Sequence, residues 1–128
     1  MDTNSWQTQL RKGAAELVVL SLLRNGERYG LEILDQAGGA GVVLSDGTLY
    51  PLLARLEREG KLEARWMMSD DAKVPRKYYR LSEEGKALTG EMQRLWHEFS
   101  AFVTGAIEES RNDRPLAAPG RNIPSAAR

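Results

Sequence analysis

The chain has 128 residues, of which 41% are hydrophobic, and 18 basic side chains balance 18 acidic ones. This is enough apolar surface for one small core, and it leaves no room for a second, catalytic domain. The absence of cysteine excludes a disulfide framework and thiolate chemistry. No apolar run approaches the roughly 18 residues that a membrane span needs, and the N-terminus lacks the features of a secretory signal. We therefore expect a cytoplasmic protein without a membrane partner.

Two helices are predicted in the first 40 residues. The first ends at Asn25-Gly26 and has an apolar face that consists of Trp6, Leu10, Ala14, Leu17, Val18, Leu20 and Leu23. A shorter second helix is marked by Tyr29, Ile33 and Leu34. The glycine-rich stretch 38–41 follows a helix pattern and lacks the ending of a phosphate-binding loop, so we interpret it as a connection between helices. Residues 42–44 are expected to form a short strand that pairs with the sheet further along.

A third helix begins near Ser45 or Asp46 and ends at Gly60. Its apolar positions recur at i, i+3, i+4 and i+7, and they are Leu49, Leu52, Leu53 and Leu56. The opposite face carries small, hydroxylated and guanidinium side chains, which are Thr48, Tyr50, Ala54, Arg55 and Arg58. Such side chains suit base edges or phosphates in a major groove. An ordinary solvated helix face has the same composition, and this helix alone does not decide between the two.

Two strand-like segments follow, residues 61–68 and 76–81, joined by a polar loop. The first segment alternates so that Leu62, Ala64, Trp66 and Met68 lie on one face. From Lys73 to Arg80 the chain carries four cations and no acid. A basic hairpin tip suits phosphates or a minor groove, although cations on strand edges also discourage aggregation. A recognition helix followed directly by a β-wing is a way of holding a DNA groove, so the two segments together favour DNA binding.

The last helix follows Ser82, which caps its start, and runs to about residue 110. Its apolar stripe has a period of about 3.5 residues and consists of Leu88, Met92, Leu95, Phe99, Phe102 and Ala106, widened by Trp96, Val103 and Ile107. The stripe is too broad for a short domain to cover alone, which indicates dimerisation; folding back over its own winged helix is the alternative. The prediction is a winged helix-turn-helix domain over 1–81, a dimerisation helix over 82–110 and a disordered tail over 111–128.

Charge is distributed unevenly along the chain. Residues 45–81 carry eight cations and six acids, whereas residues 82–110 carry two cations and six acids. The neutral total is unusual for a DNA-binding domain, and it supports an alternative function: a dimeric ligand-sensing or protein-interaction module that keeps the fold without operator binding. The only histidine, His97, lies on the acidic last helix, and no metal-ligand spacing appears. We therefore expect no enzyme, catalytic residue, metal or cofactor.

Four stretches of the sequence together resemble the PadR family of winged-helix transcriptional regulators, in its short form with a single C-terminal dimerisation helix. They are QLRKG, RYGLEI, DGTLYPLLARLEREG and RKYYRLSEEGK, and the resemblance extends from residue 5 to about residue 108. It implies a mainly α fold with a small β-wing and a long C-terminal helix. It also implies a homodimer, a pseudo-palindromic DNA operator, usually repression, and often release by a small aromatic or hydrophobic effector.

The resemblance assigns roles to residues at matching positions. Near bases and phosphates it places Ser45, Thr48, Leu49 and Tyr50 at the start of the recognition helix, with Arg55 further along. In the wing it places Lys73, Arg76 and Lys77 against the DNA backbone or the minor groove. The implied dimer interface joins Trp6 and Leu10 to the partner's last helix, whose contacts are Leu88, Met92, Leu95, Phe99, Phe102 and Val103.

Trp96 has a sharper hypothetical role. In multidrug-binding relatives a tryptophan at a similar point of the last helix lines a pocket at the dimer interface and stacks on flat aromatic ligands. By this resemblance Trp96 is the candidate effector-binding residue. Plain dimer core is the other interpretation of the same side chain.

Overall fold

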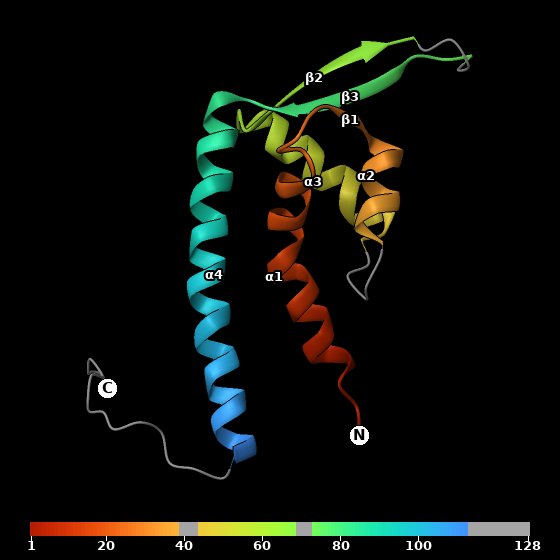
Figure 1. Ribbon diagram of the computed structural model, residues 1–128. Coiled ribbons are helices and arrows are strands. Elements are labelled where there is room, and N and C mark those ends of the chain that lie inside the picture. Colours follow the sequence, from red (N-terminus) through yellow and green to blue (C-terminus); the bar gives the residue numbers. More distant parts are fainter. Residues whose placement is uncertain (39–43, 69–72, 113–128) are drawn as a thin grey trace. The chain divides into compact units, whose positions relative to one another are not determined.

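The structure, a computed structural model, describes residues 1–38, 44–68 and 73–112. Its elements are α1 (Asn4–Leu22), β1 (Arg28–Tyr29), α2 (Gly30–Ala37), α3 (Asp46–Arg58), β2 (Leu62–Met67), β3 (Arg76–Leu81) and α4 (Glu83–Asn112) (Figure 1). The chain divides into two compact units, Met1–Met92 and Gln93–Arg128, and α4 begins in the first and continues in the second. The predicted fold class, mainly α with a small β-wing, is confirmed.

The core of the first unit lies between α1, α2, α3 and the inner face of the sheet. Its largest fully buried side chains are Val19, Leu20, Leu23, Ile33, Leu49, Leu53, Leu56 and Thr89. The predicted leucine stripe of α3 is confirmed, because three of its members are fully buried and Leu52 packs against them. Burial of each such leucine stabilises the fold by about 1.5–3 kcal/mol relative to an exposed position.

The sheet has three antiparallel strands in the order β1-β3-β2. Leu62 pairs with Leu81 and Met67 with Arg76, so the predicted hairpin is present and each strand lies within one residue of its expected bounds. The third strand differs from the expectation, since β1 pairs with β3 and Leu44 is buried outside any strand. Residues 42 and 43 lie outside the described residues.

Helix α3 and helix α4 meet at a compact joint. Gly60 ends α3 with a φ of +82°, and its N–H donates to the Glu57 carbonyl at 3.1 Å while the Lys61 N–H donates to the Leu56 carbonyl at 2.9 Å. This pair of bonds satisfies carbonyls that the end of a helix leaves unpaired. The chain therefore leaves α3 in one defined direction.

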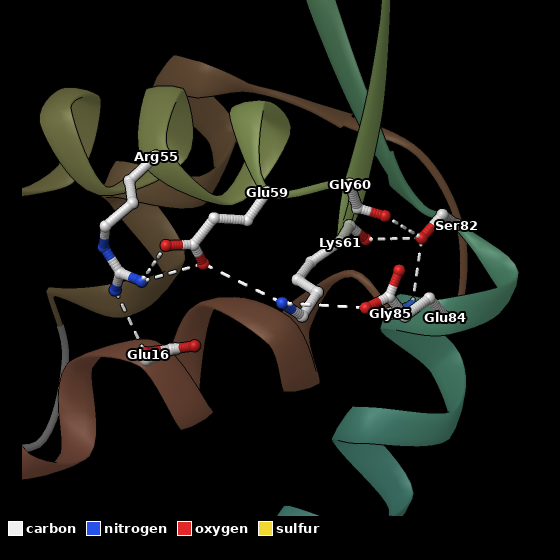
Figure 2. A network of polar contacts seen from close by, with 8 residues as sticks. All are labelled: Glu16, Arg55, Glu59, Gly60, Lys61, Ser82, Glu84 and Gly85. Atoms are coloured by element: carbon white, nitrogen blue, oxygen red, sulfur yellow. Dashed lines mark hydrogen bonds and ion pairs between the residues drawn. The ribbon is translucent and has the colours of Figure 1, made fainter.

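The start of α4 rests on the same joint. The Ser82 hydroxyl oxygen lies 2.6 Å from the Gly60 carbonyl oxygen and 3.1 Å from that of Lys61, and it accepts the Gly85 N–H at 3.0 Å (Figure 2). Gly85 is so close to Lys61 that a β-carbon added there would lie 2.1 Å from the Lys61 carbonyl oxygen. Only a residue without a side chain permits this approach, so Gly85 fixes where α4 can begin. The bond from the Gly85 N–H to the Ser82 hydroxyl confirms Ser82 as the helix cap.

The two units use the apolar stripe of α4 differently. In the first unit, Leu88 and Met92 are partly buried against the winged-helix core, and their role as dimer contacts stays a prediction. In the second unit the large apolar side chains are exposed, and they are Leu95, Trp96, Phe99, Phe102, Val103 and Ile107.

Within the described ranges no helix is long and apolar enough to cross a membrane. Most of the predicted tail, residues 113–128, lies outside the described residues.

Candidate nucleic-acid interface

The first turn of α3 presents hydroxyl groups to solvent. Ser45 precedes the helix in an extended conformation, and its carbonyl accepts the N–H groups of Thr48 at 3.1 Å and Leu49 at 2.9 Å. The Ser45 and Thr48 hydroxyl oxygens lie 3.3 Å apart, and both residues are exposed. This turn is held by its own backbone, so two hydroxyl groups are available to an outside acceptor or donor.

Leu49 does not belong to this exposed surface. Its exposed fraction is 0%, because it points into the core with Leu53 and Leu56. The expectation that Leu49 lies against DNA is therefore corrected: this leucine anchors the helix. The adjacent Tyr50 is 40% exposed and lies on the outward face together with Thr48.

A pocket of about 260 Å³ lies beside Tyr50, between α2, α3 and β3. It is lined by Tyr29, Gly30, Leu31, Tyr50, Arg76, Lys77 and Tyr79. The Tyr50 ring lies against the start of α2, where only the glycine at position 30 leaves room for it. The pocket therefore joins the outward face of α3 to the wing in one surface.

Arg76 stands at the edge of this pocket on an aromatic platform. Its guanidinium carbon lies 4.4 Å from the centre of the Tyr29 ring, and Tyr29 meets Tyr78 edge to face at 5.4 Å between ring centres. A guanidinium stacked on a ring keeps its charge and most of its hydrogen-bond donors, while the ring restricts its rotamers. Arg76 is thus a positioned cation beside α3.

Lys77 points to the opposite face of β3. Its ammonium donates to the Glu57 carboxylate at 3.0 Å and lies 5.5 Å from the centre of the Tyr79 ring. The hydrogen bond to Glu57 raises the pKa of Lys77, and burial raises the pKa of the Tyr79 phenol. Through this ion pair Lys77 ties the wing to α3, and its contact with the DNA backbone or the minor groove stays a prediction.

Arg55 is also engaged within the protein. It donates to Glu16 of α1 at 3.0 Å and to Glu59 at 3.1 Å, and these hydrogen bonds raise its pKa (Figure 2). Lys61 continues the network to Glu59 and Glu84 at 3.8 Å each. Arg55 therefore links α3 to α1 in the free protein, and its contact with DNA stays a prediction.

Some site features differ from the expectation or were missed. Lys73 is exposed and follows residues 69–72, which lie outside the described residues. Its contact with phosphate stays a prediction. Trp66, which the strand pattern placed on the same face as the buried Leu62, is 67% exposed. The described residues contain no group of three His, Asp or Glu side chains that could hold a metal ion.

Comparison with known proteins identifies the family. The model described as "Transcriptional regulator PadR-like family" matches residues 19–91. The transcriptional regulator Rv3488 of Mycobacterium tuberculosis is 30% identical over 97 residues, which cover 76% of this chain and 89% of that protein.

Solved structures agree with this match. A PadR family transcriptional regulator from Eggerthella lenta is 34% identical with a TM-score of 0.71, over 83% of this chain and 92% of the other. A PadR-like regulator from Bacillus cereus is 28% identical with a TM-score of 0.71, over 77% of this chain and 96% of the other. The chain belongs to the PadR-like family of DNA-binding transcriptional regulators.

Proposed function

We propose that this PadR-family regulator is a repressor that binds a pseudo-palindromic DNA operator as a homodimer. The observation that carries the proposal is the division of α3 into a buried leucine face and an outward face with Ser45, Thr48 and Tyr50. A helix of this kind enters a major groove with its N-terminal residues against base edges. Placed on such a site, Arg76 and Lys73 would contact the backbone beside the wing.

Homodimerisation is supported by the second unit. Phe102 is 76% exposed, and the other large apolar side chains of this part of α4 are exposed with it. Trp6 and Leu10 of α1 are exposed as well. A stripe of this size in water is typical of a protein interface, and its near-heptad spacing suits a second helix. Two copies would place two recognition helices about one helical turn, 34–36 Å, apart on the duplex.

Release by a small aromatic effector is a further part of the proposal. Trp96 is 42% exposed on α4, so its ring is open to a planar ligand at the proposed dimer interface. Planar aromatic compounds should then quench its fluorescence in a saturable way in a variant that carries Trp6→Phe and Trp66→Phe. Unsaturable quenching, or equal quenching of a variant that also carries Trp96→Phe, would remove Trp96 from the proposal.

The first experiment is selection of bound sequences from a random duplex library by the full chain. We expect an inverted repeat, and we expect Thr48→Ala with Tyr50→Ala to abolish its enrichment. Thr104→Ala is the control, because it also removes a threonine hydroxyl, but from an exposed position of α4 outside the candidate DNA surface. No enrichment by the wild type would favour the ligand-sensing or protein-interaction alternative. A reporter gene behind the selected sequence then distinguishes repression from activation.

The oligomeric state is tested by light scattering. Phe102→Glu should convert a dimer into a monomer and weaken operator binding, because a charge in an apolar interface costs several kcal/mol. Thr104→Glu introduces the same charge off the stripe and should leave the dimer intact. A wild-type monomer at micromolar concentration would contradict the proposal. Location in the cytoplasm stays a prediction.

A further inference from the structure

The outer half of the wing is unexpectedly apolar. Trp66, Met68 and Val74 are 67%, 61% and 66% exposed. Trp66 lies at the end of β2 opposite Lys77, and the other two flank the hairpin loop. Exposed tryptophan and methionine gathered on one small element usually mark a surface that meets a partner.

This patch is continuous with the candidate DNA surface. Strand alternation puts Trp66 on the same face of β2 as Leu62 and Ala64, which pack toward the helices. The Lys77 ammonium lies 5.9 Å from the centre of the Trp66 ring and also bonds to Glu57 of α3 at 3.0 Å. One cation thus links the exposed indole to the recognition helix.

The charge around the patch indicates which partner it meets. Residues 61–81 carry six cations and three acids, whereas the stripe of α4 lies within a segment, residues 82–110, that carries two cations and six acids. The two apolar surfaces therefore stand in fields of opposite sign. An apolar patch among cations fits a minor groove, where the C–H groups of deoxyribose line a channel between two rows of phosphates.

We propose that Trp66, supported by Met68 and Val74, packs on the deoxyribose wall of the minor groove beside each half-site. This inference rests on the proposed function and adds a contact to it. The indole would bury apolar area without neutralising a phosphate. Its contribution to operator affinity is therefore independent of salt concentration, unlike that of Lys73 or Arg76.

The test is a salt series of operator titrations with the full chain, using the inverted-repeat duplex returned by the selection. Trp66→Ala should weaken binding by roughly tenfold or more at every salt concentration and leave the slope of log K against log salt unchanged. Lys73→Ala should weaken binding and reduce that slope. Trp66→Phe, which keeps an aromatic face, should retain most of the affinity and shows that the position tolerates substitution.

Each outcome decides the inference. It is overturned if Trp66→Ala binds like the wild type, or if it changes the salt slope instead of the salt-independent affinity. A change in oligomeric state on Trp66→Ala would also overturn it and assign the patch to a protein contact. In these cases Thr48→Ala with Tyr50→Ala still abolishes the enrichment, so the proposed function stands. If the wild type selects no duplex, the proposed function fails and the inference fails with it.

Discussion

The joint between α3 and α4 gives the sharpest prediction about stability. Replacement of Gly85 by alanine places a β-carbon 2.1 Å from the Lys61 carbonyl oxygen, whereas ordinary van der Waals contact begins at 3.4 Å. The obstacle is backbone rather than a flexible side chain, so the start of α4 has to move by more than an ångström. That movement breaks the bond from the Gly85 N–H to Ser82, which is 3.0 Å long.

The expected cost follows from three opposing effects. Overpacking of this kind costs about 1–3 kcal/mol, and loss of an N-cap bond costs about 1 kcal/mol. Alanine is better than glycine in a helix by about 1 kcal/mol, which offsets part of this. The free energy of unfolding should therefore fall by about 2 kcal/mol in Gly85→Ala, equivalent to a fall in Tm of roughly 8 °C for a chain of this size.

Gly90→Ala is the matched control for this prediction. The same substitution on the same helix meets no atom within 4 Å, so only the gain in helix propensity remains. Thermal unfolding at one fixed protein concentration should show a rise in Tm of about 4 °C for Gly90→Ala. Equal shifts of the two variants, in either direction, would refute the argument that the contact with Lys61 decides the sign.

Three further predictions separate folding from function and fix the sign of two pH effects. Leu53→Ala should lower the free energy of unfolding in urea by about 2–5 kcal/mol, whereas Thr48→Ala should change it by less than about 0.5 kcal/mol and reduce operator binding instead. The hydrogen bond from Arg65 lowers the pKa of Glu27 below 4.5. The pair therefore stabilises the fold above pH 4.5, and this contribution is lost as pH falls through the lowered pKa. Urea unfolding at a series of pH values should show that the destabilisation caused by Arg65→Met disappears over the same pH range. Burial raises the pKa of Tyr79 above 10.0. The neutral phenol therefore stabilises the fold below pH 10.0, and this contribution is lost as pH rises through the raised pKa. The difference in absorbance at 295 nm between the wild type and Tyr79→Phe should titrate with a midpoint above pH 10.0.

Elements with a repeated pattern could be predicted from the sequence because burial itself is periodic. The leucines of α3 and the strands of the hairpin repeat at the spacing of their secondary structure, and both were placed correctly. Strand β1 has only two residues, Arg28 and Tyr29, which is too short for any alternation to appear. Its position depends on pairing with β3, a contact between segments about fifty residues apart that no local pattern encodes.

The candidate site was harder to predict because cations with different roles look alike in the sequence. Arg55 and Lys77 have the composition of phosphate contacts, yet each meets a carboxylate supplied from elsewhere, Glu16 in one case and Glu57 in the other. Such pairings depend on how α1, α3 and β3 approach one another. The exposure of Trp66 was missed for a different reason. Alternation predicts which face of a strand a side chain occupies, but it does not predict where along the strand the core ends.

The contacts around α3 also differ in how firmly they hold it. The ion pairs of Arg55 join side chains that are about a third or more exposed, and pairs of this kind contribute roughly 0–1 kcal/mol. The joint at Gly60 and Lys61 instead ties the end of α3 to the start of α4 through backbone carbonyls that bond directly to Ser82. Replacement of Arg55 should therefore disturb α3 less than replacement of Gly85. If the start of α4 is displaced, Ser82 moves with it and shifts the backbone at Gly60 and Lys61, where the chain leaves α3. If Arg55→Met weakened operator binding more than Gly85→Ala did, Arg55 itself would have to contact the DNA.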